Sequence, residues 1–93
     1  MTAHKAIAVT ITGRVQGVGY RYSVLGVAGR LGLTGWVRNA PDGSVETWAQ
    51  GHALVLDQFV AFLEQGPRSA RVDGVSLRSV APDDSLRGFT VRS

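Results

Sequence analysis

The sequence has no cysteine, only two histidines and three prolines, and no long apolar run. Without cysteine the fold cannot depend on a disulfide or a thiolate metal site, and thiol chemistry is excluded. No basic segment followed by an apolar one opens the chain, and no apolar run approaches the roughly 20 residues of a membrane span. We therefore expect a cytoplasmic protein that does not contact a membrane.

The residues that are present have an ordinary globular composition. Apolar residues make up 44% of the 93 positions and charged residues 18%, which fits a single domain over residues 1–93. The net charge is +3, and the cations, all but one of them arginine, are scattered along the chain. This balance suits an anionic partner, but no basic run suggests a nucleic-acid arm. We expect a monomer that binds no nucleic acid.

Apolar periodicity predicts the secondary structure. Residues 5–12 alternate as in a half-buried strand, and residues 20–31 then follow a helical period that Gly32 is placed to end. The apolar pattern and the turn residues predict the remaining elements in this order: strands at 33–39 and 44–50, a helix at 54–65, and strands at 72–80 and 88–92, the last at an edge.

This order of elements predicts an α+β fold of the ferredoxin-like, split βαβ type. Two helices would cover one face of an antiparallel sheet, with a short extra strand at the C-terminal edge. A helical crossover makes the first two strands parallel, which brings their C-terminal residues Gly13 and Asn39 to one end of the sheet. Asn39 has the parity of Val37, so its side chain should lie on the face that the helices cover.

The segment from Gly13 to Arg21 reads Gly-Arg-Val-Gln-Gly-Val-Gly-Tyr-Arg. Gly17 and Gly19 allow a tight turn and a close approach to a ligand, and the N–H groups of such a turn can converge on an anion. The helix that follows points its unpaired amides the same way, and Arg21 adds a planar cation that fits two phosphate oxygens. The sequence therefore predicts a phosphate-binding loop beside Asn39.

Few groups for general base or nucleophilic catalysis can reach this loop. His4 precedes the first strand and His52 follows the third, so both belong at the opposite end of the sheet. Asp42 lies in Pro-Asp-Gly, where an aspartate usually bonds its own backbone. No Ser-His-Asp set, metal cluster or carboxylate pair can be assembled there.

The remaining groups restrict the chemistry. The side chain of Asn39 cannot take a proton, but it can hold a water molecule through its oxygen and nitrogen. Phosphate monoesters are too inert for such a site, whereas a carboxylic-phosphoric anhydride already carries a good leaving group. Positioning and charge stabilisation could then suffice, so an acyl phosphate is the substrate class that fits.

Three segments resemble the signatures of the acylphosphatases: residues 13–21, Leu-Gly-Leu-Thr-Gly-Trp-Val-Arg-Asn at 31–39, and Asp-Gly-Ser-Val-Glu at 42–46. Segments 63–72 and 88–89 are also similar to the family. The resemblance implies hydrolysis of small acyl phosphates to carboxylate and inorganic phosphate without metal or organic cofactor. It implies a phosphate site made by the backbone of Val15, Gln16, Gly17, Val18, Gly19 and Tyr20. Arg21 would clamp the phosphate, Asn39 would orient the attacking water, and a substrate oxygen would take the proton.

Two departures from the family and two alternative functions accompany this interpretation. Tyr20 replaces the more common phenylalanine and needs a partner for its hydroxyl, and Ala40 replaces a residue that often carries a hydroxyl.

One alternative function is a basic ferredoxin-like module that binds nucleic acid, although Trp36 and Trp48 are expected to pack on the sheet. The other is a domain that binds acyl or carbamoyl phosphate without hydrolysing it.

Overall fold

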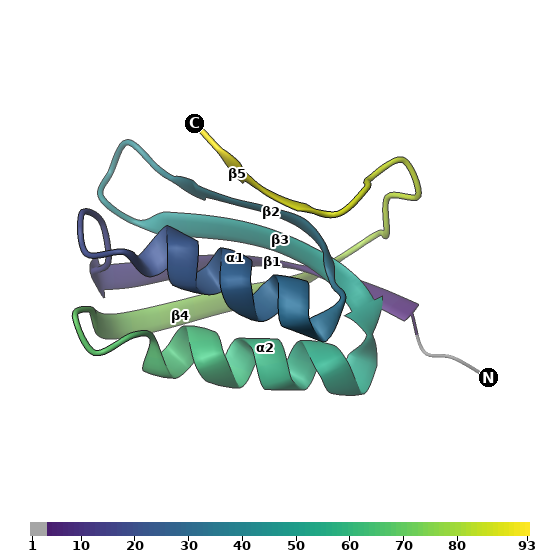
Figure 1. Ribbon diagram of the computed structural model, residues 1–93, viewed down its shortest axis with the longest axis horizontal. Helices are drawn as coiled ribbons and strands as arrows, with labels where there is room; N and C mark the ends of the chain where they lie inside the picture. Colours follow the sequence, from purple (N-terminus) through teal and green to yellow (C-terminus); the bar gives the residue numbers. More distant parts are fainter. Residues whose placement is uncertain (1–3) are drawn as a thin grey trace.

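The computed structural model describes residues 4–93 and contains two helices and five strands (Figure 1). In chain order these are β1 (His4–Arg14), α1 (Tyr20–Leu31), β2 (Thr34–Asn39), β3 (Val45–His52), α2 (Ala53–Gln65), β4 (Arg71–Val80) and β5 (Phe89–Arg92). The predicted order is confirmed. The main shifts in bounds are in β1, which runs on to Arg14, and β3, which continues through His52.

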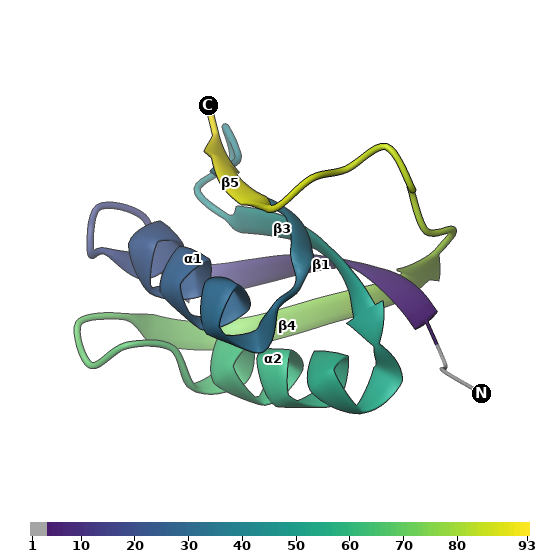
Figure 2. The same ribbon diagram turned by 45° about the vertical axis from the view of Figure 1, so that its right-hand side comes forward.

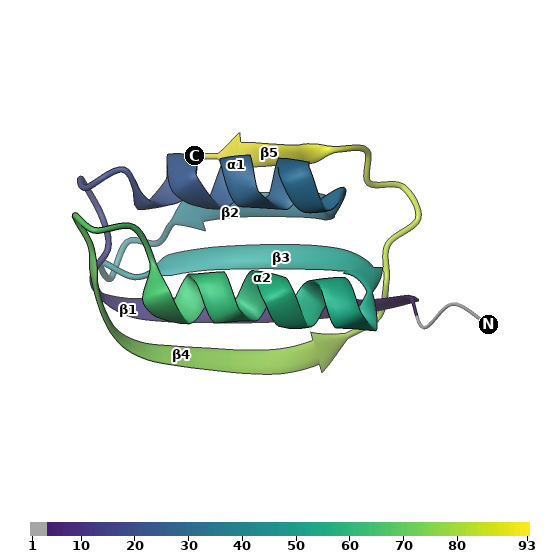
Figure 3. The ribbon, with the colours of Figure 1, turned by 60° about the horizontal axis from the view of Figure 1, so that its bottom comes forward.

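The five strands form one sheet in the order β4-β1-β3-β2-β5, with both helices on one face (Figure 3). β1 and β2 each pair antiparallel with β3, so they run parallel to each other as predicted. β5 lies at the edge, but it pairs parallel with β2, so the sheet is mixed rather than antiparallel throughout. The reason is that β4 ends where β2 begins, and residues 81–88 cross that end of the sheet before β5 starts (Figure 2).

The hydrophobic core lies between the sheet and the two helices. Odd-numbered residues of β1 such as Val9 and Ile11 are buried there against Val24 of α1 and Phe59 of α2. Burying such side chains stabilises the fold by about 1.5–3 kcal/mol each, which holds both helices on the sheet. Within residues 4–93, neither helix is long and apolar enough to cross a membrane.

Gly13 shapes the end of β1 that leads to the predicted phosphate loop. The pairing of β1 with β4 shifts register between Thr12 and Gly13, where Gly13 has φ 126°. A Cβ atom at this position would lie 2.2 Å from the carbonyl oxygen of Arg71, so only glycine fits. The bulge lets the strand continue to Arg14 before the chain turns into the loop.

Candidate functional site

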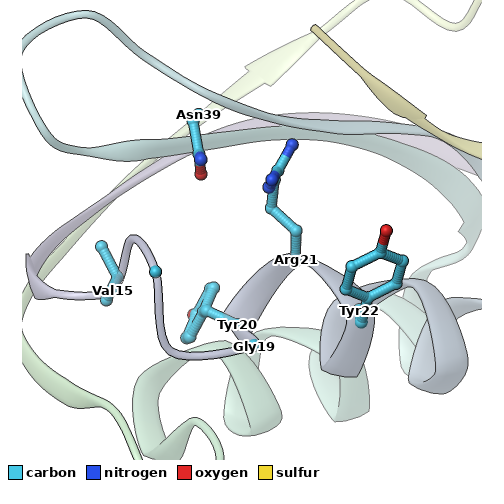
Figure 4. A pocket seen from close by; sticks show the side chains of 7 residues that line it. Val15, Gly19, Tyr20, Arg21, Tyr22 and Asn39 are labelled. Carbon is cyan, nitrogen blue, oxygen red and sulfur yellow. The ribbon is translucent and has the colours of Figure 1, made fainter.

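Both predicted catalytic residues and four of the six predicted loop residues line one pocket at the C-terminal ends of β1 and β2 (Figure 4). The pocket has a volume of about 210 Å³ and is lined by Val15, Gly17, Gly19, Tyr20, Arg21, Tyr22 and Asn39. Arg21 comes from the first turn of α1, and Asn39 is the last residue of β2. The parallel course of β1 and β2 thus brings the loop and the asparagine together, as the topology predicted.

The loop between β1 and α1 leaves its backbone donors free. Gly17 and Gly19 have φ values of 74° and 81°, the left-handed region that favours glycine, and nothing lies within 4 Å of where their Cβ atoms would be. Across residues 4–93, no protein group accepts a hydrogen bond from the amides of residues 16–19. Because α1 starts directly after them, these amides and the first amides of the helix form a region that attracts an anion.

Arg21 differs from the arginines that form ion pairs. Arg38 donates to Glu46 over 2.7 Å and Arg71 donates to Asp73 over 3.0 Å, whereas Arg21 has no carboxylate partner among the described residues. No acidic side chain lines the pocket either. The guanidinium points from α1 toward Asn39 across the pocket (Figure 4). It can therefore hold an anion against the loop amides.

Asn39 carries an unpaired polar atom. Its Oδ1 atom is the buried side-chain oxygen that lacks a hydrogen-bond partner within residues 4–93, and the side chain points into the pocket (Figure 4). A buried acceptor without a donor costs about 1–3 kcal/mol. This oxygen is therefore positioned to accept a hydrogen bond from a molecule that enters the pocket.

The side chain of Gln16 has a role that the sequence pattern, which places Gln16 in the loop backbone, does not predict. Its Nε2 atom donates to the carbonyl oxygens of Ala40 and Ser44, both at 2.8 Å. These carbonyls flank the turn between β2 and β3, so Gln16 joins the loop to the hairpin that carries Asn39. A long amide donor in a loop of glycine and valine is the signal that could have suggested such a bridge. Neither Gln16 nor Val18 lines the pocket itself.

Tyr20 finds a partner for the hydroxyl that phenylalanine would lack. The ring is buried at the start of α1, and the hydroxyl donates to the carbonyl oxygen of Leu63 in α2 over 2.7 Å. Burial raises the pKa of Tyr20 well above its ordinary value, so the phenol stays neutral. The Tyr20 hydroxyl therefore links the two helices. Ala40 is buried; its carbonyl oxygen accepts a hydrogen bond from Gln16, and its amide donates to the carbonyl oxygen of Ser44.

The side chains that were excluded as bases lie where the topology predicted. His4 pairs with His52 at the far end of β1 and β3, and the Nδ1 atom of His52 accepts a hydrogen bond from the amide of Leu54 at the start of α2. The carboxylate of Asp42 accepts from the hydroxyl and the amide of Ser44, which lowers the pKa of Asp42. Among residues 4–93, no group of three or more histidine or acidic side chains could hold a metal ion.

Comparison with known proteins identifies the family and supports the fold. A family model described as acylphosphatase matches residues 7–91. A protein from Methylococcus capsulatus named acylphosphatase is 47% identical over 87 residues, which cover 94% of this chain and 95% of that protein. The crystal structure of acylphosphatase from Bacillus subtilis superposes with a TM-score of 0.91 at 32% identity, covering 96% of this chain and 99% of the other. The structure of an acylphosphatase from Coxiella burnetii gives 0.87 at 40% identity, covering 96% and 93%. The chain therefore belongs to the acylphosphatase family of hydrolases.

Proposed function

We propose that this protein hydrolyses the carboxyl-phosphate anhydride of small acyl phosphates such as acetyl phosphate, carbamoyl phosphate or 1,3-bisphosphoglycerate. The products are a carboxylate and inorganic phosphate. The observation that carries the proposal is that Arg21, Asn39 and the glycine loop line a single pocket. Membership of the acylphosphatase family supports the same activity.

The phosphate of the substrate occupies the loop. The backbone amides of Val15, Gln16, Gly17, Val18, Gly19 and Tyr20 surround its oxygens, as the family resemblance implies. Arg21 binds two of these oxygens with its planar guanidinium, and the absence of acidic side chains from the pocket lining leaves this charge uncompensated. The loop amides and the guanidinium both lie where negative charge develops on the phosphate, so they stabilise the charge of the transition state.

Asn39 positions the attacking water. Its buried Oδ1 atom accepts a hydrogen bond from the water, whose oxygen forms a bond to phosphorus while the bond from phosphorus to the acyl oxygen breaks. The carboxylate leaves with that electron pair. A phosphate oxygen of the substrate takes the proton of the water, which agrees with the position of both histidines at the far end of the sheet.

The alternative of nucleic-acid binding has less support. Trp36 and Trp48 pair directly across β2 and β3, and the guanidinium of Arg92 lies 4.8 Å from the centre of the Trp36 ring. Arg38 beside them is paired with Glu46. On this helix-free face the Trp36 ring is thus engaged by Arg92 and Arg38 is engaged by Glu46, which leaves fewer rings and cations to bind bases.

The proposal is tested by phosphate release from acetyl phosphate, benzoyl phosphate and one phosphate monoester. We expect the wild type to hydrolyse both acyl phosphates but not the monoester, with and without a chelator. Arg21→Ala should lose this activity, whereas the control Arg78→Ala, on the helix-free face, should keep it. Binding of acyl phosphate without phosphate release would favour a non-hydrolytic binding domain. Binding of RNA that survives Arg21→Ala, without hydrolysis, would favour the nucleic-acid alternative.

A further inference from the structure

Tyr22 is a large side chain exposed at the wall of the pocket. It follows Arg21 in the first turn of α1, and 71% of it is exposed. Residues 4–93 expose two other large apolar side chains, Leu54 and Leu77, and neither lines this pocket. Figure 4 shows the ring of Tyr22 beside Arg21, on the side away from Val15. The exposed ring therefore lies next to the proposed phosphate clamp.

Among residues 4–93, no aromatic pair, cation–π contact or side-chain hydrogen bond involves the Tyr22 ring or its hydroxyl. The aromatic pair among residues 4–93 is Phe59 with Phe89, and the cation over an aromatic ring is Arg92 over Trp36. Of the two tyrosines, Tyr20 donates its hydroxyl hydrogen to Leu63, whereas the hydroxyl of Tyr22 bonds none of the described residues. The face of the Tyr22 ring is therefore free to contact a ligand.

Space for a bulky ligand continues past this ring. Tyr22 also lines a second, open groove of about 490 Å³ between α1 and α2. The other residues that line the groove are Ser23, Gly26, Val27, Arg30 and Phe62. Gly26 stands one turn after Tyr22, and no atom lies within 4 Å of where its Cβ would be. Tyr22 is thus shared between the phosphate pocket and an open apolar groove.

We propose that the acyl group of the substrate packs against the ring of Tyr22, which makes this site prefer flat aromatic acyl phosphates over acetyl phosphate. This inference rests on the proposed function, because it needs the phosphate on the loop and Arg21. The acyl group must then leave through the mouth of the pocket, where Tyr22 is the large exposed side chain. An offset stack between two rings gives a gain that a methyl group cannot match, about 2- to 10-fold in affinity.

The test compares kcat/KM for benzoyl phosphate with kcat/KM for acetyl phosphate in one set of variants. We expect Tyr22→Ala to lower the ratio by about 2- to 10-fold, because the loss falls mainly on benzoyl phosphate. Tyr22→Phe should keep the ratio because it keeps the ring, and Tyr22→Leu should give an intermediate value. Leu54→Ala is the matched control, since Leu54 is 67% exposed at the start of α2 and lines no part of this pocket. An unchanged ratio in Tyr22→Ala, or an equal loss for both substrates, would overturn the inference.

A binding experiment separates this inference from the proposed function. Phenacylphosphonate and acetonylphosphonate replace the bridging oxygen of the two substrates with a methylene group and cannot be hydrolysed there. Calorimetry should show tighter binding of the phenacyl compound to the wild type and loss of that preference in Tyr22→Ala. If the wild type hydrolyses neither acyl phosphate, the proposed function fails. The binding preference for phenacylphosphonate still tests the role of Tyr22 in that case. Equal binding of the two phosphonates, or binding of neither, would contradict that role.

Discussion

Two turns at the same end of the sheet use their backbone groups in opposite ways. In the turn between β2 and β3, the amide of Ala40 donates to Ser44 over 2.8 Å, the amide of Gly43 donates to Ala40, and Asp42 accepts two bonds from Ser44. In the loop between β1 and α1, the amides of residues 16–19 have no acceptor within the described chain. The hairpin turn is closed by its own hydrogen bonds, whereas the loop is open to a ligand.

The contrast shows how a small fold separates rigidity from binding. The closed turn fixes the end of β2 and thereby Asn39, while the open loop offers amides and Arg21 to an anion. Gln16 connects the loop to the turn, since its side chain donates hydrogen bonds to the carbonyl oxygens of Ala40 and Ser44. Changes in the open loop should therefore affect chemistry most, and changes in the closed turn least.

Replacement of the Arg21 guanidinium beside the open loop should have the largest effect. Arg21→Lys keeps the charge but loses the fork that binds two oxygens, so we expect kcat/KM for acetyl phosphate to fall by about 100-fold or more. Affinity for inorganic phosphate should fall as well, with little change in unfolding free energy. Steady-state kinetics and calorimetry measure the two effects, with Arg78→Lys as the control. Near-normal phosphate affinity in Arg21→Lys would contradict the clamp.

Asn39 is fixed by the closed turn but lines the pocket beside the open loop. Its substitution should therefore separate turnover from phosphate binding. We expect Asn39→Ala to lower kcat by about 100-fold while inorganic phosphate still binds, because the water loses its acceptor and the clamp remains. Stability should not decrease, since Oδ1 has no protein partner to lose. Phosphate titration followed by NMR provides the check. If phosphate binding disappeared together with activity, Asn39 would be a phosphate ligand or a structural residue.

Gln16→Ala would disconnect the two turns. It removes two hydrogen bonds of about 0.5–1.5 kcal/mol each, so we expect a loss of about 1–3 kcal/mol in unfolding free energy. The carbonyls of Ala40 and Ser44 keep their bonds from the amides of Gly43 and Ala40. The fall in kcat should exceed the rise in KM, because Asn39 would lose its position relative to the loop. Urea denaturation and kinetics measure both quantities. Gln58→Ala, an exposed change on α2, is the control, and equal behaviour of the two variants would exclude a positioning role for Gln16.

The smallest effect is expected inside the closed turn. Asp42→Asn keeps an oxygen that accepts from Ser44, so kcat/KM should stay within about two-fold of the wild type. The pKa of Asp42 is lowered in the fold, so its carboxylate stabilises the protein at pH values above the ordinary pKa of about 3.9. This stabilisation is lost as the pH falls through the lowered pKa of the folded state. NMR titration of the carboxyl group should show a midpoint below the ordinary one. A large loss of activity would give Asp42 a chemical role.

The order of helices and strands could be predicted because it depends on local sequence patterns. The proximity of Asn39 to the loop between β1 and α1 could be predicted because it depends on one topological rule. Residue parity placed Asn39 on the helix-covered face, and the crossover through α1 made β1 and β2 parallel. The direction of β5 could not be predicted, since residues 81–88 carry no signal for which edge strand they reach. The two hydrogen bonds of Gln16 were likewise not predictable, because their acceptors lie 24 and 28 residues away.

The sequence by itself determined the strand and helix order, the glycines that leave the loop amides exposed, and the absence of cysteine chemistry, because these depend on residue type and near neighbours. Only the tertiary structure decided which polar groups remain unpaired. Within residues 4–93, Arg21 and Oδ1 of Asn39 lack partners, whereas Arg38, Asp42 and the hydroxyl of Tyr20 have them. The physical reason is that pairing requires two groups to come within about 3 Å, and packing of distant segments sets that distance.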